Sequence, residues 1–164
     1  MGFFIFCAME LLSESVERTS AIGRKLGRVC QAGDIICLGG QLGAGKTALV
    51  QAIAEGAGVA KKEYVNSPTF AILHEYQGRI PIYHMDFYRL ETSDDVRELG
   101  LDEYLFREGL VLIEWYERAA DLMPASSLFI HLSFTSESCR TLTMQSSDES
   151  WRQRLSRLSQ NLSC

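Results

Sequence analysis

The stretch GQLGAGKT, residues 40–47, decides the fold of this chain. It matches G-x-x-x-x-G-K-[ST], a pattern in which backbone N–H groups of a glycine-rich loop surround the phosphates of a nucleotide. Residues 34–39, DIICLG, are typical of a short buried strand, and residues 47–55 are typical of a helix with Leu49 and Ile53 on its apolar side. Strand, glycine loop and helix in this order predict a P-loop that binds ATP or GTP.

The composition indicates an ordinary globular protein. The 164 residues include 46% hydrophobic and 23% charged side chains, and no repeat or long linker divides them. We therefore expect residues 1–164 to form a single P-loop domain. The formal net charge is −5, and an acidic chain repels a nucleic-acid backbone at long range. If RNA is involved, we expect a partner protein to hold most of it.

The cysteines and the N-terminal segment argue against secretion and against a membrane anchor. The five cysteines are scattered, with no C-x-x-C pair, which predicts neither a disulfide framework nor a zinc site and suits the cytoplasm. The apolar residues 2–9 lack a basic start and are too short to span a bilayer. Residues 1–8 are therefore either an edge strand or an artefact ahead of a true start at Met9; we favour the second.

The expected elements alternate between strands and helices. Residues 13–30 are predicted to be helical because Val16, Ile22, Leu26 and Val29 lie nearly on one helical face. We also expect strands at 70–76, 80–85 and 110–113, a turn at 77–78, a short helix at 94–99 with a capping box, a hairpin of 128–134 and 140–145, and a last amphipathic helix over residues 151–162. These elements predict an α/β fold, a P-loop NTPase-like three-layer sandwich with a mixed, partly parallel sheet and antiparallel edge strands.

Two acidic side chains follow predicted buried strands and are candidates for metal binding. Asp86 comes directly after the strand at 80–85, and Glu114 comes after the strand at 110–113. In a P-loop protein the lysine reaches the β- and γ-phosphates, the following threonine offers its hydroxyl to Mg²⁺, and a carboxylate from a neighbouring strand completes the metal site. Either residue could instead only mark the end of a strand. Both could also act together, one on the metal and one on the attacking water.

Two further features allow a structural and a functional interpretation. Ser67-Pro68-Thr69 lies where many P-loop proteins place a segment that senses the γ-phosphate, although the spacing alone favours a proline turn that enters a strand. Trp115 follows Glu114 and either stacks on a base or fills the core, and the core is the simpler interpretation.

Four motifs in a fixed order resemble the TsaE family, the small bacterial ATPases of tRNA threonylcarbamoyladenosine synthesis. They are GxLGAGKT at 40–47, SPT at 67–69, HxDxYR at 84–89 and EW at 114–115, and the similarity runs from about residue 13 to residue 134. The resemblance implies a cytoplasmic ATPase that uses ATP and Mg²⁺ and works with two partner proteins. It implies weak ATPase activity alone, stimulation by the transferase complex on which the protein docks, and tRNA contacts made mainly through those partners.

The resemblance also implies roles for individual residues. It assigns nucleotide contacts to Thr19, Gly43, Ala44, Gly45, Lys46, Thr47, Ala48 and Trp115. Thr47 and Glu114 are expected to hold Mg²⁺, and Lys46 and Asp86 are expected to be required for hydrolysis. Ser67, Pro68 and Thr69 become the switch-like loop.

One position departs from the family pattern. Gln41 stands inside the loop where the family usually has an aspartate. The glutamine removes a negative charge beside the phosphates but leaves every glycine, Lys46 and Thr47 in place. Nucleotide binding should survive, while the rate of hydrolysis or the response to partners is expected to differ.

Two other functions share the same loop. A small-molecule or nucleoside kinase of this size usually has an arginine-rich lid that closes over the acceptor. The arginines between residues 69 and 114 are dispersed and do not indicate such a lid. A nucleotide-gated binding module would need no hydrolysis at all, so that variants which bind but do not hydrolyse ATP would keep their function.

Overall fold

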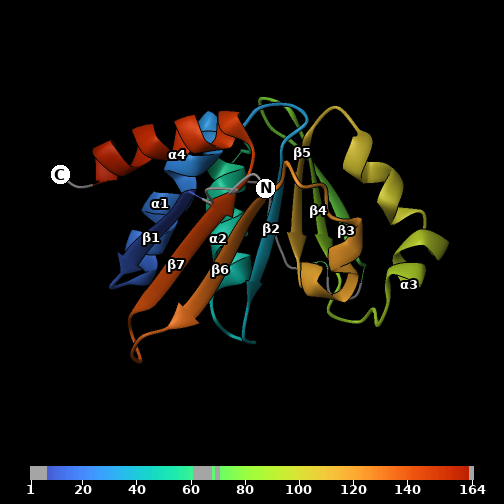
Figure 1. Ribbon diagram of the computed structural model, residues 1–164, viewed down its shortest axis with the longest axis horizontal. Coiled ribbons are helices and arrows are strands. Elements are labelled where there is room, and N and C mark those ends of the chain that lie inside the picture. Colours follow the sequence, from blue (N-terminus) through green and yellow to red (C-terminus); the bar gives the residue numbers. More distant parts are fainter. Residues whose placement is uncertain (1–6, 61–67, 69–70, 163–164) are drawn as a thin grey trace, which may run out of the picture.

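The computed structural model describes residues 7–60, 68 and 71–162. Four parallel strands form the centre of its sheet (Figure 1). The strand that enters the P-loop, β2 (Ile35–Gly40), lies between β5 (Leu110–Glu114) and β6 (Leu128–Phe134) and runs parallel to both. The fourth, β4 (Pro81–Asp86), pairs with β5 in the same direction. Parallel pairing places the C-terminal ends of all four strands at one edge of the sheet, which is the edge that carries the P-loop.

Antiparallel strands complete the sheet on both sides, as the sequence predicts. On one side, β7 (Arg140–Ser146) forms a hairpin with β6, and β1 (Cys7–Ser13) pairs with β7. On the other side, β3 (Leu73–Gln77) pairs with β4. The order across the sheet is β1-β7-β6-β2-β5-β4-β3. The predicted mixed sheet with antiparallel edge strands is therefore confirmed.

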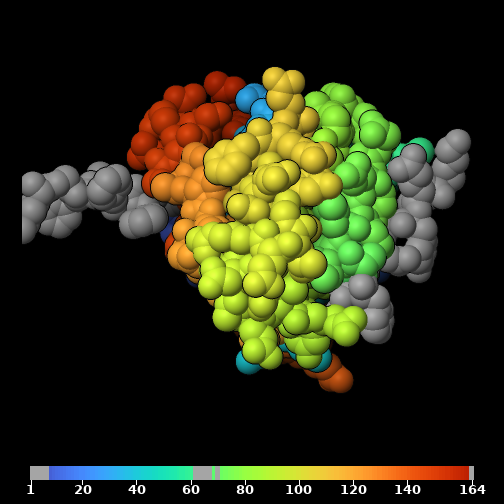
Figure 2. All heavy atoms as spheres, turned by 90° about the vertical axis from the view of Figure 1, so that its right-hand side faces the viewer, coloured from blue at the N-terminus to red at the C-terminus, as the bar shows by residue number. Residues whose placement is uncertain are grey.

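Helices cover both faces of the sheet and make the three layers. One face carries three α-helices: α1 (Val16–Val29), α2 (Lys46–Gly56) and α4 (Glu149–Leu162). The other face carries α3 (Ser93–Glu98) and two 3-10 helices, η1 (Leu101–Phe106) and η2 (Tyr116–Leu122). Seen from that side of the molecule, the yellow-green and yellow part of the chain stands at the front (Figure 2). Within the described part of the chain, none of these helices combines the length and the apolar character that crossing a bilayer requires.

The central strands are apolar on both sides because both faces are covered. In β2, Ile36 and Leu38 pack in the core under α1, α2 and α4, whereas Ile35 and Cys37 pack in the core under α3, η1 and η2. This alternation within an unbroken apolar run is expected of parallel strands that are buried on both sides. It explains why β2 and β5 are found so readily from the sequence.

Three sequence-based expectations need correction. The helix predicted over residues 13–30 begins only at Val16, because Ser13 ends β1 and the Ser15 side chain caps the helix by accepting from the Arg18 N–H. The strand predicted at 70–76 is Leu73–Gln77. The helices η1 and η2 are absent from the prediction because each is too short to show a clear period. The capping box is confirmed, with Thr92 and Asp95 bonded reciprocally.

The N-terminal segment forms an edge strand from Cys7 onward, where all seven residues of β1 pair with β7. Ala8, which the favoured alternative placed in an artefactual start, lies in this strand opposite Gln145. Residues 1–6 lie outside the described part of the chain.

Helices α1 and α2 touch through glycine. A Cβ atom added at Gly27 of α1 would lie 2.0 Å from the Ile53 carbonyl oxygen, and one added at Gly56 of α2 would lie 2.2 Å from the Arg24 carbonyl oxygen. Both obstacles are backbone atoms, which cannot move aside as a flexible side chain can. Because glycine has no side chain at these two positions, α1 and α2 can pack with their backbones in contact.

We expect Gly27→Ala to destabilise the protein. Alanine ordinarily favours a helix by up to about 1 kcal/mol over glycine, but the collision with Ile53 should outweigh this and lower the free energy of unfolding by about 1–3 kcal/mol. Urea denaturation measures the change. Ser20→Ala, on the same helix, is the control for a small substitution, and a Gly27→Ala protein as stable as this control would contradict the close packing.

Candidate functional site

The loop between β2 and α2 has the backbone shape that its glycines allow. Gly40, Gly43 and Gly45 have φ angles of 133°, 78° and 105°, a region that residues with a side chain rarely adopt. Gly45 is the N-cap of α2 and provides no side chain to accept hydrogen bonds from the first turn. The N–H groups at the start of α2 therefore remain open to an anion, and the positive end of the helix dipole adds to the attraction.

Lys46 is buried at the first position of α2 and turns toward the loop. Its Nζ donates to the carbonyl oxygens of Gly40 at 2.6 Å and Gln41 at 2.8 Å, and it lies 4.3 Å from the ring centre of Trp115. Burial lowers the pKa of Lys46, and the carboxylates of Glu114, Glu117 and Asp86 oppose this change. The loop thus holds one ammonium group among several carboxylates.

The two candidate carboxylates come together at the ends of neighbouring strands. Asp86 and Glu114 are paired residues at the ends of β4 and β5, and each is only 2% exposed. The Thr47 hydroxyl donates to Glu114 at 3.0 Å from Oε2 and 3.3 Å from Oε1. Asp86 Oδ1 accepts from the Tyr88 N–H at 2.8 Å. Thr47, Glu114 and Asp86, which the sequence identifies as separate candidates, therefore lie together in the structure.

His84 is a member of this cluster that the sequence-based residue set omits. It is completely buried, and its Nε2 lies 2.8 Å from Glu114 Oε1, while its Nδ1 has no partner among the described residues. If Nδ1 carried the proton, a buried N–H would be unsatisfied and a lone pair on Nε2 would face a carboxylate. The ring therefore carries a proton on Nε2 and donates it to Glu114. The signal in the sequence is that His84 and Asp86 lie on the same strand two residues apart, and so share one face.

These groups line a pocket of about 360 Å³ beside the P-loop. Its walls come from the loop and α2 on one side and from the ends of β4 and β5 on the other: Leu42, Gly43, Gly45, Lys46, Thr47, Ala48, Asp86, Tyr88, Glu114 and Trp115. The polar side chains converge near the open N-terminus of α2. The pocket is suited to phosphate and to a divalent cation.

A second pocket adjoins the first across the start of α2. It holds about 260 Å³ and shares Gly45 and Ala48 with the first pocket, and Thr19, Ala44 and Arg140 line it as well. The Thr19 hydroxyl is 2.7 Å from Ser13 Oγ, and Arg140 Nε donates to the Ala44 carbonyl at 3.2 Å. The structure thus places Thr19, in a helix distant in sequence, beside the P-loop.

Trp115 lies in the pocket, although the sequence alone favours the core. Its ring is half-buried between Lys46 and Tyr88, with 5.0 Å between the Tyr88 and Trp115 ring centres. Its backbone has φ 57° and ψ 38°, which is unusual for a bulky residue, and its N–H bonds to the Leu38 carbonyl at 3.2 Å. Such strain at the end of a strand is common at binding sites. Sequence patterns give no sign of it.

The predicted switch-like loop is described only in part. Ser67 and Thr69 lie outside the described residues, and Pro68 is buried. The Pro68 carbonyl accepts from the Ile72 N–H, and the Ile72 carbonyl accepts from the Asp86 N–H at 3.0 Å. Ile72 has φ 67°, a rare value for a β-branched residue. Two successive hydrogen bonds therefore connect the predicted loop to Asp86.

The family model for the threonylcarbamoyl adenosine biosynthesis protein TsaE matches residues 13–142. The chain belongs to the TsaE family. Curated relatives with the same description include one from Treponema pallidum, 37% identical over 136 residues, which cover 83% of this chain and 99% of the relative. Another, from Bacillus subtilis, is 41% identical over 128 residues, or 77% of this chain and 78% of the relative.

A solved structure supports the same assignment for the fold. The crystal structure of Bacillus subtilis YdiB superposes with a TM-score of 0.82 at 30% identity and covers 96% of this chain and 97% of that chain. The P-loop NTPase-like fold predicted from the sequence is confirmed for this TsaE-family protein.

The residues of the site fit a nucleotide with a magnesium ion. The carboxylates of Asp86 and Glu114 are both buried, and Lys46 is the ammonium group they share, so one more cation would balance the cluster. Among residues 7–60, 68 and 71–162, no group of three or more His, Cys, Asp or Glu side chains could hold a metal by itself. Mg²⁺ commonly takes one or two protein ligands and completes its shell with phosphate and water, and the Thr47 hydroxyl with the Glu114 carboxylate offers such a pair.

We expect the contact between His84 and Glu114 to be measurable in stability. His84→Leu removes the donor from a buried carboxylate and should lower the free energy of unfolding by about 1–3 kcal/mol. His84→Gln keeps an N–H group at a similar reach and should recover much of that loss. Urea denaturation of both variants measures the difference.

His131→Leu is the matched control, because His131 is exposed on β6. If His84→Gln were as unstable as His84→Leu, the loss would reflect packing of the ring, and the hydrogen bond to Glu114 would contribute nothing.

Proposed function

We propose that this chain is a magnesium-dependent ATPase that serves the biosynthesis of threonylcarbamoyladenosine in tRNA. The observation that carries the proposal is the meeting of Thr47, Glu114 and Asp86 at the open N-terminus of α2. A hydroxyl and two carboxylates at this place are what magnesium-assisted hydrolysis of a nucleotide requires. The tRNA pathway follows from the names of the relatives, which are described as tRNA threonylcarbamoyladenosine biosynthesis proteins.

Each residue of the first pocket has a role in this proposal. Lys46 leaves its carbonyl partners to bind the β- and γ-phosphates, and the N–H groups from Gly43 to Ala48 surround them. Thr47 and Glu114 hold Mg²⁺: the Thr47 hydroxyl can donate to Glu114 and still offer a lone pair to the metal. Bound Mg²⁺ neutralises charge that develops on the phosphates during hydrolysis.

Asp86 is the group proposed to orient the attacking water. It lies beside Glu114 at the end of the neighbouring strand, and its Oδ1 accepts from the Tyr88 N–H. A carboxylate in this position can accept a proton from water as the water attacks. In this proposal Glu114 binds the metal, and Asp86 orients the attacking water.

The second pocket is proposed to receive the nucleoside. It adjoins the phosphate pocket through Gly45 and Ala48, and Val16, Ala44 and Ala48 give it an apolar side. Ala44 and Thr19 would lie against the base or the ribose. Trp115 lines the phosphate pocket instead, where its ring covers Lys46.

Partner proteins are proposed to stimulate this ATPase and to hold the tRNA. The net charge of −5 disfavours tight binding of tRNA by this chain alone. Leu42 in the P-loop is 70% exposed and Tyr88 is 40% exposed, so apolar surface lies beside the pocket, where a docked protein would cover it. ATP binding and hydrolysis then act as a switch on the transferase complex of two other proteins. Gln41 changes the charge of the loop and is expected to tune this response.

Two substitutions should separate binding from hydrolysis. Lys46→Ala removes the charged donor for phosphate and should weaken ATP binding by roughly 10–100-fold. Asp86→Asn should leave binding nearly unchanged and lower turnover by roughly 10²–10⁴-fold. Titration with a fluorescent ATP analogue measures the first effect, and phosphate release measures the second.

Asp94→Asn on α3, an exposed aspartate, is the control for the loss of a carboxylate. Unchanged ATP affinity in Lys46→Ala would refute the P-loop assignment. If Asp86→Asn kept full activity in cells while it failed to hydrolyse ATP, the protein would be a nucleotide-gated binding module.

Stimulation by the partner proteins tests the proposed function as a whole. We expect slow ATP turnover by the chain alone and a clear increase when the proteins of the threonylcarbamoyl transferase complex are added. The same reactions, supplied with a panel of nucleosides and metabolites, test the kinase alternative. Transfer of phosphate to any acceptor would favour a kinase, and an ATPase rate that the partners do not change would exclude the proposed switch.

A further inference from the structure

A basic groove lies at the edge of the sheet opposite the P-loop. It has a volume of about 720 Å³, and five cationic side chains line it: Lys25, Arg28, Arg79, Arg154 and Arg157. Lys25 and Arg28 lie near the C-terminal end of α1, Arg154 and Arg157 lie on α4, and Arg79 precedes β4. Strand β2 starts near this groove and ends at the P-loop, and its six residues separate the two sites by about 20 Å.

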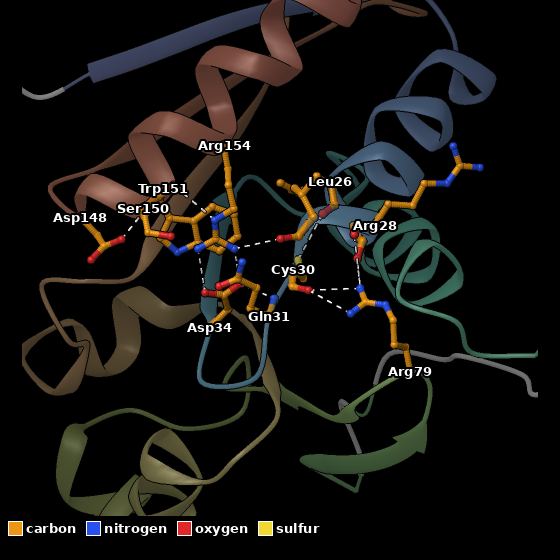
Figure 3. A network of polar contacts seen from close by, with 12 residues as sticks. Leu26, Arg28, Cys30, Gln31, Asp34, Arg79, Asp148, Ser150, Trp151 and Arg154 are labelled. Carbon is orange, nitrogen blue, oxygen red and sulfur yellow. Dashed lines mark hydrogen bonds and ion pairs between the residues drawn. The ribbon is translucent and has the colours of Figure 1, made fainter.

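Two of these arginines hold the end of α1, as Figure 3 shows. Arg79 donates to the carbonyl oxygens of Gly27, Arg28 and Cys30 at distances between 3.1 and 3.4 Å. Arg154 donates to the Val29 carbonyl at 3.0 Å and forms a two-point ion pair with Asp34, at 2.5 and 2.9 Å. Carbonyl groups accept hydrogen bonds without cancelling charge, so Asp34 neutralises Arg154 while Arg79 keeps its positive charge.

The other two arginine side chains of the groove have no partner among the described residues. Arg28 and Arg157 are exposed, and neither side chain makes a hydrogen bond or an ion pair with any residue of the described part of the chain. In Figure 3 the Arg28 side chain extends away from the network around Asp34. No Asp or Glu is among the described residues that line the groove. This local surplus stands out in a chain with 21 acidic and 16 basic residues.

The chemistry of the groove favours an extended polyanion over a small anion. The backbone groups that point toward the arginines are carbonyl oxygens at the C-terminus of α1, the negative end of the helix dipole. A compact phosphate site would present N–H groups instead. An anion bound here must contact the outer side chains, which are spread over α1, α4 and the turn before β4.

The surface also disfavours a folded protein as the occupant. Stable protein interfaces usually have a buried centre with large apolar or aromatic anchors. The exposed large apolar side chains among the described residues are Leu12, Val16, Leu42, Tyr88, Leu99, Phe106 and Phe134, and none of them lines this groove. A polar, cationic surface without such anchors is instead typical of contacts with nucleic acid.

We propose that the basic groove binds the phosphate backbone of RNA. Arg28, Arg157 and Arg79 make the contacts, which depend on charge and not on base sequence. That the RNA is a tRNA rests on the proposed function. Partner proteins hold the tRNA, and the groove adds one more contact to it. The groove lies about 20 Å from the nucleotide site, at the other end of β2.

The test compares two variants of the full chain that lose the same charge. Arg28→Gln with Arg157→Gln removes two side chains that make no hydrogen bond or ion pair with the described residues, so the fold should be unaffected. Arg97→Gln with Arg118→Gln removes two exposed arginines from α3 and η2. Fluorescence anisotropy with a labelled, unmodified tRNA transcript measures binding at low salt, about 50 mM, where phosphate contacts are strongest.

We expect weak, salt-dependent binding by the unaltered chain and roughly tenfold weaker binding by the Arg28/Arg157 variant. The slope of log K against log salt concentration should fall by about 2, one for each lost phosphate contact. The Arg97/Arg118 variant should bind as the unaltered chain does.

Three results would overturn the proposal: no binding by the unaltered chain at low salt, equal loss in both variants, or a loss of binding to the transferase proteins without a loss of binding to tRNA. The last result would make the groove a docking surface for protein. Stimulated ATP turnover, measured on the same samples, reports on the proposed function separately, because neither variant alters the nucleotide site.

Discussion

Glu114 accepts hydrogen bonds from two different elements, and the arrangement of the site depends on this shared carboxylate. Thr47 donates to it from the first turn of α2, and His84 donates to it from β4, while Glu114 itself ends β5. The three elements come from distant parts of the sequence and meet only because β2 lies beside β5 and β5 lies beside β4. A buried carboxylate must keep its donors, so the position of each element constrains the other two.

Much of the fold follows from the sequence because its signals are local. The apolar run of β2 and the glycines from Gly40 to Gly45 define a strand and a loop within a dozen residues, and the spacing of Trp151, Leu155 and Leu158 defines α4. The places where prediction was wrong are also local. Ser13 lies within the predicted helix but belongs to β1, because pairing with β7 overrides the weak preference of a short segment.

The site is predictable as a set of residues but not as an arrangement. Lys46, Thr47, Asp86 and Glu114 can be named from their positions after strands, yet the bond from Thr47 to Glu114 depends on which strands are neighbours. The order of the strands across the sheet is set by contacts between segments that are distant in the sequence. The hydrogen bond from His84 to Glu114 and the left-handed backbone of Trp115 stay hidden for the same reason, since each is defined by what surrounds it. The basic groove collects side chains from three separate segments, so no window of sequence contains it.

The glycine contact between α1 and α2 has a mechanical consequence. Helix α1 is 14 residues long, about 21 Å, with Thr19 of the second pocket near one end and Arg28 of the basic groove near the other. Helix α2 starts at the P-loop and presses its backbone against Gly27. At this contact backbone lies against backbone, and there is no side chain between the helices that could change its rotamer. The two helices therefore form one packed unit that reaches from the P-loop to the basic groove.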